Sequence, residues 1–157
     1  MSKTTPATLA LTKAGAAFTL HTYAYDPNGQ RVGLQAAEAL GEDPCRVLKT
    51  LMAEVDGRPV CVAIPSDREV SMKKLAAAFG GKSAAMMKPS AAERLTGYVV
   101  GGISPFGQKR PVPTAMEEMA LLEDYIYLNG GQRGLQVRLD PNEALSVLGA
   151  VAVDLVS

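Results

Sequence analysis

The stretch Gly97-Tyr98-Val99-Val100-Gly101-Gly102-Ile103-Ser104-Pro105-Phe106-Gly107-Gln108-Lys109-Arg110 is the most informative part of this chain. A short apolar run leads into a Gly-Gly pair, a proline and a third glycine, and two cations follow. Glycine lets a backbone approach a ligand closely, proline fixes its shape, and exposed N–H groups beside cations suit an anionic or carbonyl-bearing ligand. Two interpretations stay open from these residues alone: a ligand-binding loop, or an ordinary strand-loop-strand connection that begins with a strand over residues 98–100.

On both sides of this loop the sequence alternates short strands with short helices. Strand patterns cover residues 18–25, 48–55, 59–64, 84–87, 125–129, 135–139 and 150–156. Capping residues, first-turn prolines and terminal glycines predict helices over residues 6–14, 33–40, 72–79, 89–95 and 141–148, and a short one from residue 44. Asp56-Gly57 is typical of a hairpin turn. This mixture predicts an α+β or mixed α/β fold with a mixed, partly closed sheet.

Length and composition favour one globular domain over residues 1–157. Of the 157 residues, 47% are hydrophobic and 20% are charged, which excludes a disordered chain. No apolar run is long enough for a membrane helix, and no signal peptide is recognisable, so we expect a cytoplasmic protein. The formal net charge is zero, which argues against a general polyanion binder, although residues 71–111 are locally basic and compatible with a nucleic-acid contact.

Familiar catalytic and metal-binding patterns are missing from the sequence. Cys45 and Cys61 form no CxxC motif, and His21 is the single histidine, so no zinc ligand set is expected. A Ser-His-Asp triad would have to use His21, for which we expect a structural role. The segment from Gly102 to Lys109 is one residue out of register with a phosphate-binding P-loop.

Lys49 is an unusual lysine because its neighbours in Leu48-Lys49-Thr50-Leu51-Met52 are apolar on both sides. In strand register it shares a face with Leu51 and Ala53, where a cation is costly unless it has a partner or a function. An edge-strand lysine whose ammonium reaches water explains the pattern equally well. Periodicity alone does not separate these two interpretations.

Four blocks of the sequence resemble the YbaK family of aminoacyl-tRNA deacylases, which is similar to the editing domain of bacterial prolyl-tRNA synthetases. The blocks are His21-Thr22-Tyr23, Val47-Leu48-Lys49-Thr50-Leu51, the segment from Leu95 through the glycine-rich loop to Lys109, and Gly130-Gly131-Gln132-Arg133-Gly134-Leu135. They occur in the family's order, and the resemblance extends over nearly the whole chain. The resemblance implies an α+β fold with a mixed, mainly antiparallel, barrel-like sheet and peripheral short helices.

The resemblance also implies roles for particular residues. Lys49 falls on the family's principal functional lysine and is the expected catalytic side chain. The expected substrate-binding residues are Tyr23, Thr50, Gly101, Gly102, Ile103, Ser104, Pro105, Asn129, Gly130 and Gln136. Candidates for contacting tRNA are Lys109, Arg110 and Arg133. No cofactor and no metal ion are expected.

The implied activity is trans-editing, in which mischarged Cys-tRNA(Pro), and also Cys-tRNA(Cys), is deacylated by attack of the substrate's own thiol on the ester. Such an intramolecular nucleophile has a high effective concentration, so the protein needs to orient and polarise the substrate. The expected partners are the mischarged tRNA and, in a ternary complex, prolyl-tRNA synthetase. A deacylase that uses water against alanine or another small residue, and a non-catalytic tRNA- or synthetase-binding module, are the alternatives.

Two positions depart from the pattern of close family members. These tend to carry serine before the Gly-Gly turn and an acidic residue two positions after Arg-Gly, where this chain has Asn129 and Gln136. Glutamine cannot act as a carboxylate base or pair with an ammonium group. The two departures therefore leave the amino-acid specificity open.

Overall fold

The computed structural model describes residues 3–29 and 31–157, whose strands form two sheets. One sheet has three strands in the order β1-β7-β6, and the other has five in the order β4-β2-β3-β5-β8. The strands are β1 (Thr19–Thr22), β2 (Leu48–Val55), β3 (Arg58–Pro65), β4 (Ala84–Met86), β5 (Thr114–Glu117), β6 (Ile126–Asn129), β7 (Leu135–Leu139) and β8 (Val151–Val153). Four of the strand pairings are antiparallel, and the pairings of β5 with β3 and β8 are parallel.

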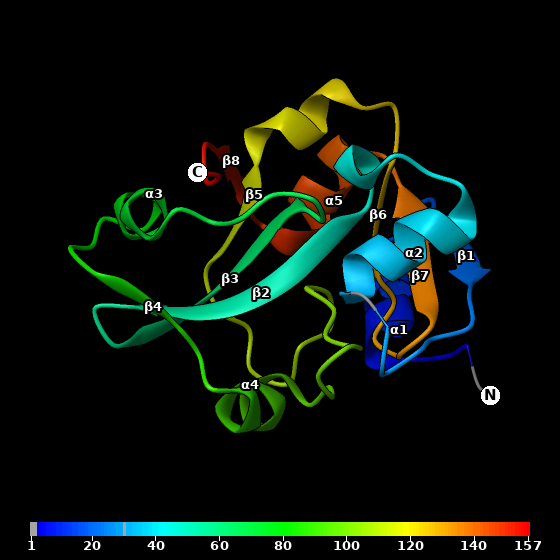
Figure 1. Cartoon of the computed structure of the whole chain (residues 1–157), viewed down its shortest axis with the longest axis horizontal. Helices are drawn as coiled ribbons and strands as arrows, with labels where there is room; N and C mark the ends of the chain where they lie inside the picture. Colours follow the sequence, from blue (N-terminus) through cyan, green and yellow to red (C-terminus); the bar gives the residue numbers. More distant parts are fainter. Residues whose placement is uncertain (1–2, 30) are drawn as a thin grey trace.

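Strand β2 is the long element that connects the two sheets (Figure 1). It pairs with β3 along its whole length and with β4 near its end. Just before β2, Val47 forms a parallel bridge with Tyr127 of β6 in the other sheet. The expected mixed, mainly antiparallel α+β fold is confirmed, and the described strands form two joined sheets rather than one closed barrel.

The hairpin between β2 and β3 is formed as its turn residues predict. Asp56 and Gly57 both have positive φ angles, of 50° and 79°, as a type I′ turn requires. The Asp56 carboxylate also accepts hydrogen bonds from the backbone N–H groups of Lys82 and Ser83. The turn therefore fixes the register of β2, which carries Lys49 opposite Ile64.

Short helices lie around the sheets (Figure 1). They are α1 (Pro6–Lys13), α2 (Val32–Leu40), α3 (Met72–Ala78), α4 (Pro89–Thr96) and α5 (Pro141–Leu148), with 3-10 turns η1 (Pro44–Arg46) and η2 (Glu118–Leu122). Thr5, Ser71 and Asp140 cap α1, α3 and α5 with their side chains, as their positions in the sequence predict. In the view of Figure 1, α3 lies at one end of the molecule and α1 and α2 at the other. None of the described helices has the length and apolar character needed to cross a bilayer.

The sequence interpretation was wrong for residues 98–100 and did not predict β5 or η2. Residues 98–100 form no strand: Tyr98 is buried and donates its hydroxyl to the Phe106 carbonyl at 2.6 Å, whereas Val99 and Val100 are exposed. The segment after Gly97 therefore turns back on itself instead of extending. Strand β5 was not predicted, although it lies between β3 and β8 in the five-stranded sheet.

A buried carboxylate holds the C-terminal segment against the end of β5. Glu117 is only 1% exposed, and its oxygens accept hydrogen bonds from the N–H groups of Met119, Leu155 and Val156 at 3.0, 2.8 and 3.2 Å. Buried charge is tolerated when it is hydrogen-bonded in this way. This carboxylate has its partners within the fold and is a structural group.

Candidate active site

A pocket of about 560 Å³ opens beside β2, between α4, the loop around Gly101 and the N-terminal end of α2. Six of the residues expected to bind or act on a substrate line it: Lys49, Thr50, Gly101, Ile103, Asn129 and Gln136. They come from three blocks that are far apart in the sequence, and they meet because β2 lies next to both β6 and the glycine-rich loop.

Lys49 projects from β2 into this pocket with only 15% of its side chain exposed. Burial lowers the pKa of its ammonium group, and the nearby Glu69 carboxylate opposes that shift. The two charged groups are 3.8 Å apart, between Lys49 Nζ and Glu69 Oε1. A snorkelling surface lysine would be well exposed, so the geometry favours a lysine held at a ligand site.

Four buried polar side-chain atoms have no hydrogen-bond partner among the described residues. Thr50 Oγ1 and Gln136 Oε1 belong to residues that line the pocket, whereas Tyr23 Oη and Gln132 Oε1 belong to residues outside its lining. Burial raises the pKa of the Tyr23 hydroxyl, which keeps it protonated as a donor at neutral pH. Because unpartnered buried polar groups are costly, the two in the pocket lining indicate groups that bind a polar ligand.

The glycine-rich loop comes close to the turn that follows β6. Gly101 has a φ of +91°, and a Cβ on Gly102 would lie 2.9 Å from the backbone nitrogen of Arg133. Neither position accepts a side chain without strain or a shift of backbone. The N–H of Gly102 donates to Val99, while the N–H groups of Gly101 and Ile103 have no acceptor among the residues the structure describes.

Asn129 and Arg133 fasten this loop from the opposite side. Asn129 Nδ2 donates to the Gly101 carbonyl at 3.1 Å, and Arg133 Nε donates to the Val100 carbonyl at 2.9 Å. The Arg133 guanidinium also lies over the Tyr25 ring, 5.4 Å from its centroid. Arg133, expected as a contact to tRNA, is therefore at least partly engaged in holding the loop.

Five further predicted substrate-binding residues lie outside the lining of the pocket: Tyr23, Gly102, Ser104, Pro105 and Gly130. Ser104 is fully buried, and its hydroxyl accepts from the N–H of Phe106. The Gly130 carbonyl accepts from the Thr5 hydroxyl at 2.5 Å. These residues form the support behind the pocket wall, and direct contact with a substrate stays a prediction for them.

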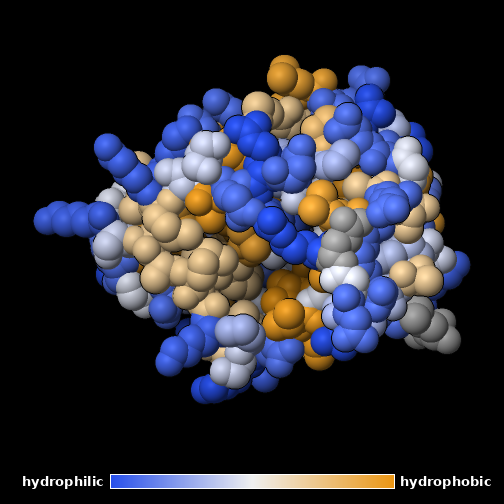
Figure 2. Space-filling model, viewed as in Figure 1, coloured by the Kyte–Doolittle hydropathy of each residue, from blue (hydrophilic) through white to orange (hydrophobic). Residues whose placement is uncertain are grey.

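The sequence interpretation missed the apolar and acidic parts of the pocket. Its apolar wall includes four methionines, Met52, Met72, Met86 and Met87. Figure 2 shows pale-orange residues gathered over β4 and the adjoining half of β2, beside a hollow near the centre of this face. Glu69 was missed because it lies in the segment between β3 and α3, where no strand or helix pattern relates it to Lys49.

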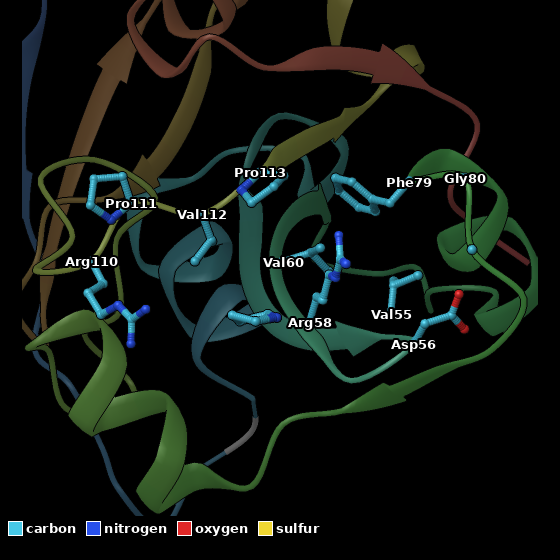
Figure 3. A pocket seen from close by; sticks show the side chains of 12 residues that line it. Val55, Asp56, Arg58, Val60, Phe79, Gly80, Arg110, Pro111, Val112 and Pro113 are labelled. Atoms are coloured by element: carbon cyan, nitrogen blue, oxygen red, sulfur yellow. The ribbon is translucent and has the colours of Figure 1, made fainter.

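Lys109 and Arg110 are exposed and lie outside this pocket. Arg110 borders a second pocket of about 650 Å³, together with Arg58, Phe79 and Asp56 (Figure 3). In that view Arg58 stands near the centre of the hollow, Arg110 enters from one side, and Phe79 and Asp56 lie on the other. Arg58 follows the Asp56-Gly57 turn and was not singled out from the sequence.

His21 and the two cysteines do not line the Lys49 pocket, although Cys61 packs behind it against Met52 and Ala92. The His21 ring packs edge-on against Tyr127, with centroids 5.3 Å apart, and its Nε2 is 2.8 Å from Thr19 Oγ1.

Burial raises the pKa of Cys61 to about 12 and that of Cys45 to about 11, so both thiols are protonated at neutral pH. Within residues 3–29 and 31–157 no group of three or more His, Cys, Asp or Glu side chains gathers as a metal site would need.

Residues 27–146 match the model of a protein family described as "Aminoacyl-tRNA editing domain". The chain belongs to this family. The resemblance to YbaK-type deacylases seen in the sequence is thereby confirmed.

Curated relatives of this editing domain agree with that assignment. The chain is 39% identical, over 112 residues, to an Enterococcus faecalis protein named "Putative Cys-tRNA(Pro)/Cys-tRNA(Cys) deacylase EbsC", a match that covers 71% of this chain and 68% of the relative. It is 29% identical to a proline–tRNA ligase of Maridesulfovibrio salexigens over 106 residues. That match covers 68% of this chain and 18% of the ligase, so the editing domain corresponds to a small part of the larger enzyme.

Solved structures share the fold of this editing domain. A crystal structure described as "a putative trans-editing enzyme for prolyl tRNA synthetase" superposes with a TM-score of 0.82 at 23% identity, covering 97% of this chain and 95% of the other. The structure of a hypothetical protein, APE2540, superposes with a TM-score of 0.85 at 22% identity, covering 98% of this chain and all of the other. At these identities the likeness establishes the fold.

Proposed function

We propose that this editing domain is a trans-acting deacylase that clears Cys-tRNA(Pro), and also Cys-tRNA(Cys), by attack of the substrate thiol on its own ester. The observation that carries the proposal is the half-buried Lys49 in a pocket whose described lining contains no serine, cysteine or histidine. The named relative from Enterococcus faecalis supports the substrate class. Because the proposed substrate is a charged tRNA, we also propose that the protein acts in the cytoplasm.

The chemical step needs no nucleophile from the protein. The cysteinyl sulfur attacks the ester carbonyl carbon, the bond from that carbon to the ribose oxygen breaks, and the thiol proton passes to the departing ribose hydroxyl. The products are a cyclic thioester and uncharged tRNA. Because nucleophile and ester belong to one molecule, orientation alone supplies a large part of the rate, with effective concentrations of roughly 10⁵ M or more in favourable cases.

The protein's part is to orient and polarise the ester. The N–H groups of Gly101 and Ile103, which have no described acceptor, are the proposed donors to the oxyanion that develops on the carbonyl. Lys49 supplies positive charge beside this oxygen or the terminal phosphate. One donor of this kind contributes about 2.7–4 kcal/mol to transition-state stabilisation in well-studied enzymes.

Deacylation of a panel of charged tRNAs tests this function. Wild-type protein is expected to release cysteine from Cys-tRNA(Pro), and Lys49→Ala to lower the rate about 100-fold or more. Lys73→Ala is the matched control, because Lys73 is exposed on α3 and lies outside the pocket. Equal rates for wild type and Lys49→Ala would overturn the role of the lysine.

The other charged tRNAs in the panel separate the alternatives. Ser-tRNA(Pro) presents a hydroxyl in place of the thiol and is expected to be stable. Release of alanine from Ala-tRNA(Pro) would instead indicate water as the nucleophile. Salt-dependent tRNA binding without deacylation of any charged tRNA would indicate a binding module.

We also propose that tRNA and prolyl-tRNA synthetase are the macromolecular partners. Arg110, its neighbour Lys109 and Arg58 are the proposed contacts to the tRNA backbone, because all three are exposed and Arg110 and Arg58 line the second pocket. Co-purification with prolyl-tRNA synthetase, with and without tRNA, tests the ternary complex. Retention of the synthetase only when tRNA is present would support it, and no retention under either condition would contradict it.

A further inference from the structure

The pocket around Lys49 contains a single acidic side chain among its lining residues, Glu69. At Gln136, where the family resemblance leads us to expect an acid, the side chain is neutral. Gln136 is 2% exposed, lines the same pocket, and has its Oε1 without a partner among the described residues. This chain therefore has a carboxylate in the pocket, but on a different segment.

The Glu69 carboxylate lies at the mouth of the pocket between two cations. It forms an ion pair with Arg31, and its Oε1 is 3.8 Å from Lys49 Nζ. Both contacts use Oε1, so Oε2 has no partner within the part of the chain that the structure describes. The side chain is 63% exposed and accessible to a ligand that enters the pocket.

Arg31 and Lys49 keep this carboxylate ionised. The hydrogen bond from Arg31 and the charge of Lys49 hold the Glu69 pKa below its usual value. At neutral pH the pocket thus presents a cation and an anion side by side. An aminoacyl ester has the complementary arrangement, because its carbonyl oxygen and its α-ammonium are attached to adjacent carbon atoms.

We propose that Glu69 binds the α-ammonium group of the aminoacyl ester while Lys49 faces the ester, so that the site selects esters with a free α-amine over N-blocked ones. This inference rests on the proposed deacylase function of the Lys49 pocket. Glu69 supplies the charge that Gln136 cannot supply. Peptidyl- and formyl-aminoacyl esters lack the ammonium and are the substrate class excluded by this contact.

In a competing explanation, Glu69 affects the reaction only because its negative charge acts on Lys49. That role would not depend on the substrate's amine, so the two can be separated with one pair of substrates. The Glu69→Gln variant is compared with wild type on Cys-tRNA(Pro) and on N-acetyl-Cys-tRNA(Pro), both of which keep the thiol. Gln has nearly the same shape, and the exposed site makes a folding defect unimportant.

We expect Glu69→Gln to lower kcat/KM for the free-amine substrate about tenfold, the size of a charge-assisted hydrogen bond at a partly exposed site. The N-acetyl substrate is expected to react slowly with wild type and to be unaffected by the substitution. An equal loss on both substrates, or no loss on either, overturns the proposal. Asp67→Asn is the control, because Asp67 adds negative charge near Lys49 but does not line the pocket.

A binding measurement keeps this inference testable apart from catalysis. The probe is a non-hydrolysable amide analogue of cysteinyl-adenosine, prepared with a free or an acetylated α-amine and titrated calorimetrically. Wild type is expected to bind the free amine about tenfold more tightly than Glu69→Gln does, with no difference for the acetylated form. Equal affinities of the two proteins for the free amine would overturn the role of Glu69 even if no ester were cleaved, whereas a lack of cleavage alone would count against the deacylase function.

Discussion

Asn129 joins the end of β6 to the glycine-rich loop through one hydrogen bond, from its Nδ2 to the carbonyl of Gly101 at 3.1 Å. The same side chain accepts, through Oδ1, from the N–H groups of Gly131 and Gln132 at 2.7 and 3.2 Å. One amide thus supplies both the donor and the acceptor that this junction needs. A serine, which the family resemblance leads us to expect at this position, has a shorter side chain and a single donor.

The Asn129→Asp variant separates the donor function of this side chain from its acceptor function. Aspartate keeps the acceptor for the turn but loses the donor to Gly101 and places negative charge against its carbonyl. We expect loss of about 1–3 kcal/mol in folding stability and a lower kcat/KM for deacylation, measured by urea unfolding and by release from Cys-tRNA(Pro). Wild-type activity in Asn129→Asp would show that the position of Gly101 does not matter.

Tyr98, a residue of the hydrophobic core, makes the folding stability sensitive to alkaline pH. Burial raises its pKa to about 12 from the ordinary value of 10.0, and its hydroxyl donates to the Phe106 carbonyl. The folded protein holds this proton more tightly than the unfolded chain, so the contribution is complete below pH 10 and is lost as pH rises toward 12. Tyr98→Phe is expected to cost about 1 kcal/mol at pH 8 and to flatten the decline above pH 10, as urea unfolding at both pH values would reveal.

Lys49→Met is expected to abolish deacylation and to raise stability at the same time. The pKa of Lys49 lies below its ordinary value, so its protonated form destabilises the fold relative to the unfolded chain. This destabilisation of the fold is fully present at pH values below the lowered pKa of Lys49. It disappears as the pH rises to 10.5, the ordinary pKa of a lysine. At pH 7 we expect a gain of about 1 kcal/mol in the free energy of unfolding. The exposed-site control, Lys73→Met, should change neither quantity, and a less stable Lys49→Met would contradict this account.

Arg58 and Arg110 should contribute to tRNA affinity by pairing with phosphates. Replacing either with alanine is expected to weaken binding of uncharged tRNA and to reduce the slope of log affinity against log salt by about 1 for each phosphate that is no longer neutralised. Filter binding over a series of salt concentrations measures both. Lys13→Ala, which removes an exposed cation from α1, is the control. Unchanged slopes in the arginine variants would assign the tRNA-binding role to another surface.

Much of the fold could be predicted because the decisive signals are local. Asp56-Gly57 specifies its hairpin by backbone conformation, and Thr5, Ser71 and Asp140 mark helix starts by satisfying free N–H groups. Lys49 was recognisable as unusual because its apolar neighbours make an unpartnered cation costly. These signals depend on neighbouring residues and not on how distant segments meet.

The features that escaped prediction depend on interactions between distant segments. Strand β5 has four residues between prolines and a 3-10 turn, and it is a strand because β3 and β8 flank it in parallel. Residues 98–100 are apolar like a strand, but burial of Tyr98 and its bond to Phe106 bend them away. Glu69 reaches Lys49 only through the path of the chain after β3.

The methionines that line the pocket allow its shape to change independently of the position of its polar groups. Lys49, Asn129 and the glycine loop are held by backbone and amide hydrogen bonds, whereas Met86 and Met87 belong to β4 and the start of the segment toward α4. Methionine side chains are unbranched and adapt to differently shaped neighbours. We therefore expect changes in β4 to reshape the apolar side of the pocket while Lys49, Asn129 and the glycine loop stay in place, so that this short edge strand is where the proposed substrate preference can be altered.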